Sequence, residues 1–400
     1  MTTTATLQPP TPKSTRAARG DELSFQSSLS TSLGVELELM ILDHESGDLA
    51  PGAVPILKAC ESDSVAGVTA ELMQSMIEVK TGVCQNVAEV RAQLLPNLRR
   101  LSNISRSLGY DLAFSATHPF HRTSGSVVYP AERYEQIVER LAWLTHQRVV
   151  FGLHVHVGVP SGDLAIATIN MLVQYLPHLL ALSANSPFWN GVDTGLASTR
   201  ACLYRLLPHA GVPRYFPHWK QFRSFCQTMI DCKTIRSFKD IYWDIRPRPD
   251  FGTIEFRICD MPASLTEVFA LTALTRCLVI HCLRLLEDRP KTRAGDIRKH
   301  WIAVENKWLA TRYGLNGMYI RTPSGKRRRL RQDVSDLVRR LEPIARETGD
   351  APFLTALGAV EKFESGADWQ RARFREVGDW KVLMGEMKSR LATELAGNGS

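Results

Sequence analysis

The sequence predicts an α+β fold with a mainly antiparallel sheet and helices around it. Three segments, 31–43, 151–159 and 252–260, alternate apolar and polar side chains. This two-residue period is typical of strands with one buried face. Strands and helices do not follow the regular β-α-β-α order of a parallel sheet. An antiparallel sheet with helices packed on its apolar face therefore fits the pattern best.

The remaining segments are assigned in chain order. An extended piece follows the turn at Ser46 and Gly47, and further strands are expected at 77–81 and 110–116. Segments with helical spacing or long apolar runs predict helices at 86–108, 131–150, 164–182, 265–287 and 296–313, with two more helical segments in the C-terminal part. Residues 1–30, rich in Thr, Ser, Pro and Ala, are predicted to be a disordered tail before a single domain at 31–400.

Composition narrows the class of protein but does not select a function. The chain has 400 residues, 44% of them apolar, which is enough for a large core. Its net charge of +8 favours anionic partners without choosing among them. None of the eight cysteines forms a C-x-x-C pair, and the N-terminus lacks the apolar segment of a secretion signal. The longest apolar stretches are interrupted by polar residues, so we expect a cytoplasmic protein with no membrane span.

The polar faces of the three alternating strands carry the strongest functional signal. Each strand has two ligand-type side chains two positions apart, and this spacing places both on one face. The opposite face of each strand is apolar and can pack on helices. The pairs are Glu36 with Glu38, His154 with His156, and Glu255 with Arg257.

If these strands are neighbours, their polar faces form one surface on which three glutamates repel one another unless cations lie between them. Carboxylates suit Mg²⁺, a histidine is acceptable beside them, and an arginine can hold a phosphate oxygen. The alternative for any single strand is a half-exposed edge whose charges are solvated. Recurrence of the pairing on all three strands favours the joint site.

Two more glutamates, Glu71 and Glu78, are candidates for the same site. A separation of seven residues places them on opposite faces of one regular strand. Action at one metal therefore requires a bend or loop between them. The alternative is a pair of surface charges.

Several motifs together resemble the glutamate–cysteine ligase type 2 family of carboxylate–amine ligases. The strand motifs are Leu33–Glu38, Gly152–Gly158 and Gly252–Arg257. The most specific stretch is Leu182–Trp189, which continues through Gly191, Asp193–Gly195, Ser198 and Arg200, and Trp243–Pro247 also matches. The resemblance covers residues from about 33 to about 320.

This resemblance implies a catalytic domain similar to that of glutamine synthetase. Its curved, mainly antiparallel sheet would form a funnel-shaped active site, with helices outside. It also implies a reaction: ATP phosphorylates a carboxylate, an amine attacks the acyl phosphate, and phosphate leaves. Glutamate and cysteine are the substrates that the family implies, and residues 31–400 would be one catalytic domain with a helical C-terminal part.

The resemblance also implies roles for individual residues. One Mg²⁺ would be held by Glu38, Glu71 and Glu78, and a second by Glu36, His154 and Glu255. Arg257 would contact the transferred phosphoryl group, which makes it and Glu255 the catalytic pair. His156 is a nucleotide-contact candidate, and Arg200 and Arg246 are candidates for binding phosphates or the substrate carboxylate. The alternatives are a buried histidine with satisfied hydrogen bonds and arginines in structural salt bridges.

Two segments stand apart from this pattern. Residues 121–125, after Thr117–Phe120, differ from the family's pattern and leave the substrate preference open. The basic run 325–331 is interpreted as a solvated helix start, with an anion or nucleic-acid contact as the alternative.

Two other function classes compete with a ligase. In a zinc amidohydrolase, His154 and His156 would bind one metal, but that site needs further histidines, an aspartate and a β/α barrel. A nucleic-acid-binding protein is disfavoured by the mild net charge and by the lack of a recognised module. The expected partners are small carboxylates and amines, and a homodimer is the working expectation for assembly.

Overall fold

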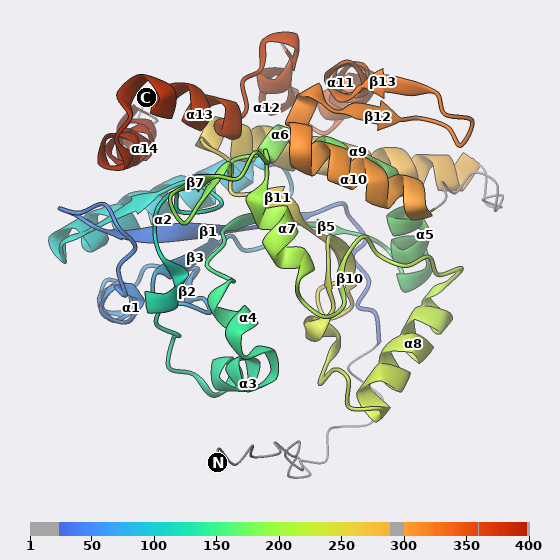
Figure 1. The fold of residues 1–400 in the computed structure, drawn as a ribbon. Coiled ribbons are helices and arrows are strands. Elements are labelled where there is room, and N and C mark those ends of the chain that lie inside the picture. The colour runs from blue at the N-terminus through green and yellow to red at the C-terminus, as the bar shows by residue number, and fades with distance from the viewer. Residues whose placement is uncertain (1–23, 289–299, 359, 398–400) are drawn as a thin grey trace, which may run out of the picture.

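The computed structural model describes residues 24–288, 300–358 and 360–397 (Figure 1). Most of the tail predicted at 1–30, and the start of the helix predicted at 296–313, lie outside these residues. The main sheet contains β1 (Leu33–Asp43), β2 (Val68–Ala70), β3 (Met76–Lys80), β4 (Tyr110–Ala113), β5 (Gly152–Gly158), β10 (Ile245–Arg248) and β11 (Thr253–Asp260). Short two-stranded pairs are formed by β6 (Phe188–Trp189) with β7 (Val192–Asp193), β8 (Ala210–Gly211) with β9 (Tyr242–Trp243), and β12 (Met318–Ile320) with β13 (Arg327–Arg329).

Helices surround the sheet. The first half of the chain has α1 (Ala53–Ser62), α2 (Val87–Ser107), α3 (Glu132–Leu141), α4 (Trp143–His146), α5 (Gly162–Leu172), α6 (Leu176–Ser183) and α7 (Thr199–Arg205). The second half has α8 (Trp219–Asp231), α9 (Leu265–Asp288), α10 (His300–Tyr313), α11 (Leu330–Glu347), α12 (Ala351–Leu354), α13 (Gly366–Val377) and α14 (Trp380–Gly397).

The strand order is β10-β11-β5-β1-β3-β2, with β4 also pairing with β1, and every pairing in this sheet is antiparallel. The α+β prediction with an antiparallel sheet is therefore confirmed. The three alternating segments become β1, β5 and β11, which lie side by side. Their polar faces consequently form one surface.

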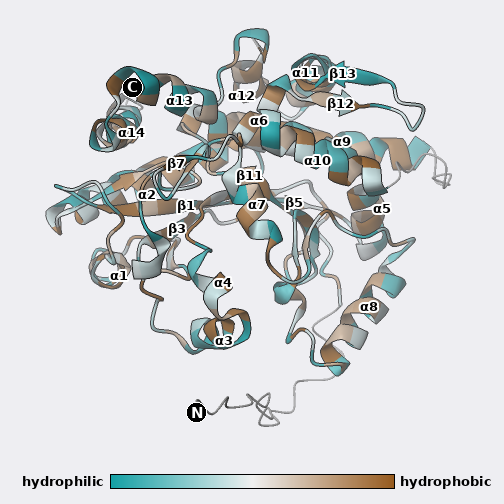
Figure 2. Ribbon diagram, in the orientation of Figure 1, coloured by the Kyte–Doolittle hydropathy of each residue, from teal (hydrophilic) through white to brown (hydrophobic). Residues whose placement is uncertain are grey.

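The apolar sides of the same strands build the core. Val35, Leu37, Val155, Ile254 and Phe256 are all buried. In Figure 1, α9 and α10 lie above the sheet, and α3, α4 and α8 lie below it. The strands are largely brown in the hydropathy view, whereas peripheral helices such as α8 and α13 carry hydrophilic turns (Figure 2). All eight cysteines are free thiols.

Two apolar helical stretches, Gly162–Ser183 and Leu265–Asp288, have the length and composition of membrane spans. Most of each lies inside the structure, and buried core helices of soluble proteins pass the same test. They are therefore weak evidence for a membrane protein.

Several helix predictions need correction. The helix predicted at 131–150 breaks at Ala142, whose φ of 47° is incompatible with an α-helix, and ends at His146. The helix predicted at 164–182 divides into α5, a 3₁₀ turn and α6, because Pro177 in the first turn of α6 has no N–H to continue the ladder. By contrast, α2 runs through Pro96, and the basic run forms β13 before α11 begins.

Glu267, in the first turn of α9, is expected to make stability depend on pH. Burial raises its pKa to about 7 from an ordinary 4.5, despite hydrogen bonds from the Ala263 N–H and from Ser264. The folded state therefore holds this proton more tightly than the unfolded state, and the resulting stability is full below pH 4.5 and lost as pH rises through 7.

We expect Glu267→Gln, which cannot ionise, to raise the free energy of unfolding above pH 7 by at most about 3 kcal/mol. Near pH 4.5 the substitution should change little. Urea denaturation near pH 4.5 and above pH 7 measures the free energy of unfolding of the wild type and the variant under both conditions. A gain confined to the acidic pH would contradict this assignment.

Candidate active site

Strand register brings the polar side chains of the sheet together. Glu36 on β1 lies opposite His154 on β5, and Glu38 lies opposite Glu78 on β3. On the other side of β5, His156 lies opposite Glu255 on β11, which lies opposite Arg246 on β10. The polar side chains of five neighbouring strands thus share one face.

The part of this face that carries Glu36, Glu38, Glu78 and His154 forms the floor of a cavity of about 310 Å³, whereas His156 and Glu255 do not line that cavity. Its walls come from α3, from the segment before β5, from α7 and from the chain around β9. The acidic lining residues are Glu36, Glu38, Glu71 and Glu78; the basic ones are Lys80, Arg133, Arg148, Lys239, Arg246, Arg248 and Arg257; and tyrosines 134, 204 and 242 also contribute. Carboxylates and cations thus share one concave site, which suits a ligand with several anionic groups.

Glu36 is at the centre of the floor. Its two carboxylate oxygens lie 3.1 Å from Nδ1 of His154 and 3.4 Å from Nε2 of His156. Burial would raise the pKa of Glu36, but the hydrogen bond with His154 and the nearby imidazole of His156 hold it well below its ordinary value. Burial, reinforced by the positive charge of Arg257, lowers the pKa of His154 to about 4. At neutral pH this geometry therefore presents an ionised carboxylate beside a neutral imidazole.

Glu38, Glu71 and Glu78 form the acidic end of the cavity. The chain bends between β2 and β3, so both Glu71 and Glu78 line the cavity. Burial raises the pKa of all three carboxyl groups, and repulsion between them adds to the effect for Glu71 and Glu78. A cation among them would relieve both penalties.

Glu255 is fully buried and surrounded by guanidinium groups. Arg246 donates to both of its oxygens at 2.7 and 3.2 Å, Arg248 donates at 3.2 Å, and Arg257 donates as well. Burial would raise the pKa of Glu255, but Arg246 and Arg257 hold it well below its ordinary value. These four bonds occupy the acceptor positions of the carboxylate. Glu255 can ligate a metal only if one of these guanidinium groups moves away.

Arg257 is oriented from two sides. It also donates to the Tyr204 hydroxyl at 2.6 Å, and its backbone N–H donates to Asp244 O. Asp244 is itself held by Lys307 on α10 through a buried ion pair at 2.7 Å. In this structure Glu255 and Tyr204 together hold the guanidinium at the cavity wall.

Arg200 lies beneath the floor and is not among the residues that line the cavity. Its Nη2 donates to Arg257 O at 3.3 Å, and its Nη1 lies 3.9 Å from the Asp260 carboxylate. Gly152 faces it, and any Cβ at that position would collide with the guanidinium. This arrangement therefore does not favour direct contact between Arg200 and a ligand. That contact stays a prediction.

The motif at 182–189 is held by the same buried aspartate. Asp260 accepts hydrogen bonds from the Asn185 N–H, from the Ser186 hydroxyl and from the Ser198 hydroxyl. Its side chain thus joins the end of α6 and the start of α7 to β11. This network explains why a conspicuous sequence motif lies behind the site and not in it.

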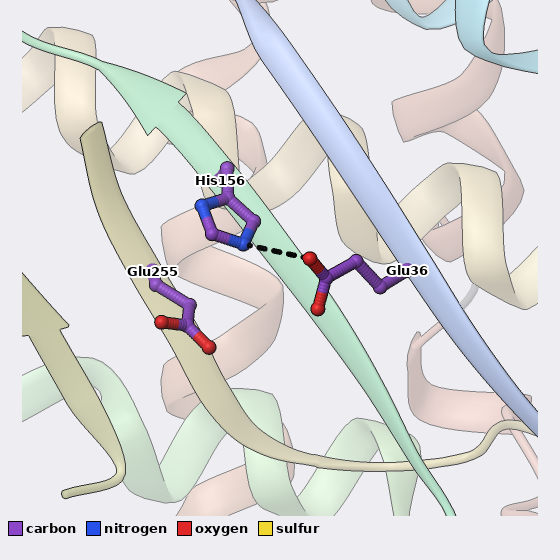
Figure 3. Close-up of side chains that lie close together, drawn as sticks. All are labelled: Glu36, His156 and Glu255. Atoms are coloured by element: carbon purple, nitrogen blue, oxygen red, sulfur yellow. Dashed lines mark ion pairs between the residues drawn. The ribbon is translucent and has the colours of Figure 1, made fainter. Parts of the chain in front are cut away.

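Two groups of side chains have the geometry of a cation site. The donor atoms lie within 4.8 Å of one another in the group Glu36, Glu78 and His154 and in the group Glu36, His156 and Glu255 (Figure 3). The Nε2 atoms of both histidines are buried and form no hydrogen bond in the described part of the chain. Oxygen-rich groups with a free imidazole nitrogen fit Mg²⁺ or a similar hard cation.

These groups differ from the predicted ligand sets. Glu36 belongs to both groups, and His156, expected to contact nucleotide, takes a place beside Glu255. Four further lining residues were not predicted from the sequence: Tyr134, Arg148, Tyr204 and Arg248. Only Arg248 could have been found from the sequence, because it lies two residues from Arg246 and shares a face of the same strand with it. The other three residues lie at helix ends or in loops, where no sequence pattern marks them.

Comparison with known proteins gives the family. Residues 32–390 match the model of glutamate–cysteine ligase family 2. A putative glutamate–cysteine ligase 2 of Gloeobacter violaceus is 39% identical over 376 residues, which cover 93% of this chain and all of that protein. The chain belongs to this family. It is accordingly a ligase that forms carbon–nitrogen bonds, as the strand motifs predicted.

Other relatives agree with this assignment. A putative glutamate–cysteine ligase 2 of Thermobifida fusca is 38% identical over 366 residues, covering 90% of this chain and 91% of that protein. Among solved structures, the glutamate–cysteine ligase of Francisella tularensis in complex with AMP superposes with a TM-score of 0.65 at 11% identity and covers 94% of this chain and 95% of that one. A bifunctional glutathione synthetase of Pasteurella multocida gives 0.63 at 14% identity, covering 90% of this chain and 52% of that one. At these identities the two structures support the fold alone.

Proposed function

We propose that this family member is an ATP-dependent, Mg²⁺-dependent ligase that joins a carboxylate to an amine through an acyl phosphate. The observation that carries the proposal is the shared cavity, which buried carboxylates and the Arg257 guanidinium line together. Such a site can hold divalent cations and a polyphosphate together. We also propose that residues 31–400 act as one catalytic domain whose sheet curves around the nucleotide as a funnel.

The reaction balances in two steps. A carboxylate oxygen of the acid attacks the γ-phosphorus of ATP, the bond to ADP breaks, and an acyl phosphate forms. The nitrogen of the amine then attacks the acyl carbon, phosphate leaves with its bonding electrons, and the nitrogen loses a proton. The protein needs no nucleophile of its own, and its task is to align the reactants and stabilise charge.

The metal sites are assigned by donor chemistry. We propose that Glu38, Glu71, Glu78 and His154 serve one cation, and that Glu36, His156 and Glu255 serve another, with Glu36 able to contact both. When bound, Mg²⁺ neutralises phosphate oxygens and fixes their orientation. Because Glu255 is saturated by arginines, we infer that Arg257 leaves it for the transferred phosphoryl group when nucleotide binds, and that Arg246 and Arg248 stay.

The substrates follow from the family. Its name supplies glutamate and cysteine, and we propose an amino acid as acid and a small amine-bearing molecule as its partner. The amidohydrolase alternative gains no support, because the sheet is antiparallel and no β/α barrel is present in the described chain. Cytoplasmic location, a homodimer and the absence of a nucleic-acid partner stay predictions.

The direct test is a phosphate-release assay with ATP, MgCl₂, L-glutamate and L-cysteine, extended to pools of other acids and amines. We expect phosphate, ADP and amide in equal amounts, with release dependent on acid, amine and metal together. Mass spectrometry identifies the amide. ATP-independent hydrolysis of amides, or no turnover with any pool, would contradict the proposed function.

A further inference from the structure

Arg148 is a cavity-lining cation to which no role has been assigned above. It lies between α4 and β5, where Val149 and Val150 on its C-terminal side are buried. Its guanidinium carbon is 5.1 Å from the centre of the Tyr242 ring. Its Nη1 is buried and has no hydrogen-bond partner in the described chain. The side chain is thus held at the cavity wall by its stem and by a ring; the Glu71 carboxylate attracts it electrostatically but forms no ion pair with it.

The other basic residues of the cavity are either paired with a carboxylate or exposed to solvent. Arg246, Arg248 and Arg257 all donate to Glu255. Lys80 lies 3.6 Å from Glu78, while Arg133 and Lys239 are exposed to solvent. Arg148 is half-buried, and no carboxylate of the described residues lies within the 4.0 Å of an ion pair. Its donors are therefore available to a ligand.

A guanidinium in this position favours binding of an anionic ligand. Removing a charged donor from water without a partner is costly, and the planar fork of arginine matches a carboxylate through two parallel hydrogen bonds. A phosphate could offer the same oxygens. Arg148, however, is separated from Arg257 by two aromatic rings: it packs on Tyr242, whose ring centre is 6.1 Å from that of Tyr204, the partner of Arg257.

We propose that Arg148 binds the carboxylate of the acid substrate that is not phosphorylated, and so selects an amino dicarboxylic acid. The inference rests on the proposed function, because it takes the end near Arg257 as the place of phosphoryl transfer. One carboxylate of the acid reacts there, and the second is held at Arg148. Arg148 thus determines specificity and has no part in bond making.

The test is a binding measurement that does not require turnover. Isothermal titration with L-glutamate, in the presence of MgCl₂ and a non-hydrolysable ATP analogue, compares the wild type with Arg148→Gln, Arg148→Lys and Arg223→Gln. Arg223 is an exposed arginine of α8, and its substitution removes the same charge outside the cavity. 4-Aminobutyrate, which is glutamate without its α-carboxylate, serves as the second ligand.

We expect Arg148→Gln to weaken glutamate binding about 10- to 100-fold. The same variant should leave 4-aminobutyrate binding and the affinity for the ATP analogue unchanged, so the preference for glutamate disappears. The glutamate affinity of Arg148→Lys should lie between those of the wild type and Arg148→Gln. The affinity of Arg223→Gln should match that of the wild type. Equal thermal unfolding of all four proteins checks the fold.

Three results would overturn the proposal: unchanged glutamate affinity in Arg148→Gln, an equal loss for both ligands, or a loss of affinity for the nucleotide analogue instead. A wild type that binds glutamate no better than 4-aminobutyrate would overturn it too. Failure of the proposed function is distinguishable, because it would appear as the absence of amide synthesis even where the binding preference is present.

Discussion

Arg257→Gln is expected to lower kcat about 1,000-fold while the protein stays folded. Charge that develops on a transferred phosphoryl group is stabilised by such a guanidinium, and losing one preorganised donor of this kind costs roughly 100- to 1,000-fold or more. Glu255 keeps Arg246 and Arg248 as partners in the variant, so its buried charge stays compensated. The KM for ATP should change much less than kcat, because the side chains that would hold the cations are unchanged in this variant.

Steady-state kinetics with saturating acid and amine measure this effect. Arg257→Lys keeps the positive charge but lacks the paired N–H donors of the planar guanidinium, and should recover part of the rate that Arg257→Gln loses. Arg340→Gln, an exposed arginine on α11, is the matched control. Turnover of Arg257→Gln within tenfold of the wild type would exclude the assigned role of Arg257.

Glu36→Gln is expected to lower kcat/KM by more than about 100-fold and to raise the Mg²⁺ concentration needed for half-maximal turnover. Even partners that only orient metal ligands are worth about 10- to 100-fold, and Glu36 belongs to both groups of candidate ligands. His154 and His156 keep the Glu36 carboxylate ionised, and the neutral glutamine amide of the variant removes this negative charge. The side chain keeps its size, so the packing of β1 should not change.

Magnesium titrations of turnover, for the wild type and for Glu36→Gln, measure the second effect. Glu45→Gln removes an exposed carboxylate just beyond β1 and should behave as the wild type. An unchanged magnesium requirement in Glu36→Gln, even with reduced turnover, would mean that this residue does not bind the metal.

Sequence alone could predict the sheet face because the rule behind it is local. Two-residue spacing on an alternating strand fixes which side chains share a face, so Glu36 with Glu38 and His154 with His156 required no tertiary information. The same rule showed that Glu71 and Glu78 could share a site only through a bend or loop, and it left a pair of surface charges as the alternative. The motif resemblance added the family, which the comparisons confirm.

What the sequence could not give depends on contacts between distant segments. The saturation of Glu255 involves arginines on two strands, and the position of Arg200 beneath the floor depends on Gly152 and Asp260. Helices α1 and α8 were missed because neither has a local capping signal: the residue before α1 is Gly52, and the first N–H of α8 donates to Asp163, which lies 56 positions away in the sequence. In the C-terminal part of the described chain, the four helices α11 to α14 replace the two helical segments expected there.

The central claim is that acidic side chains from separate strands hold divalent cations against the phosphates of a nucleotide. It is tested most directly by anomalous diffraction from crystals grown with Mn²⁺ and a non-hydrolysable ATP analogue. We predict manganese peaks in the cavity, in contact with Glu36 and with at least one of Glu78, His154 and His156, and bridged by the analogue's phosphates. Bound nucleotide with manganese elsewhere, or with none at these carboxylates, would contradict the account.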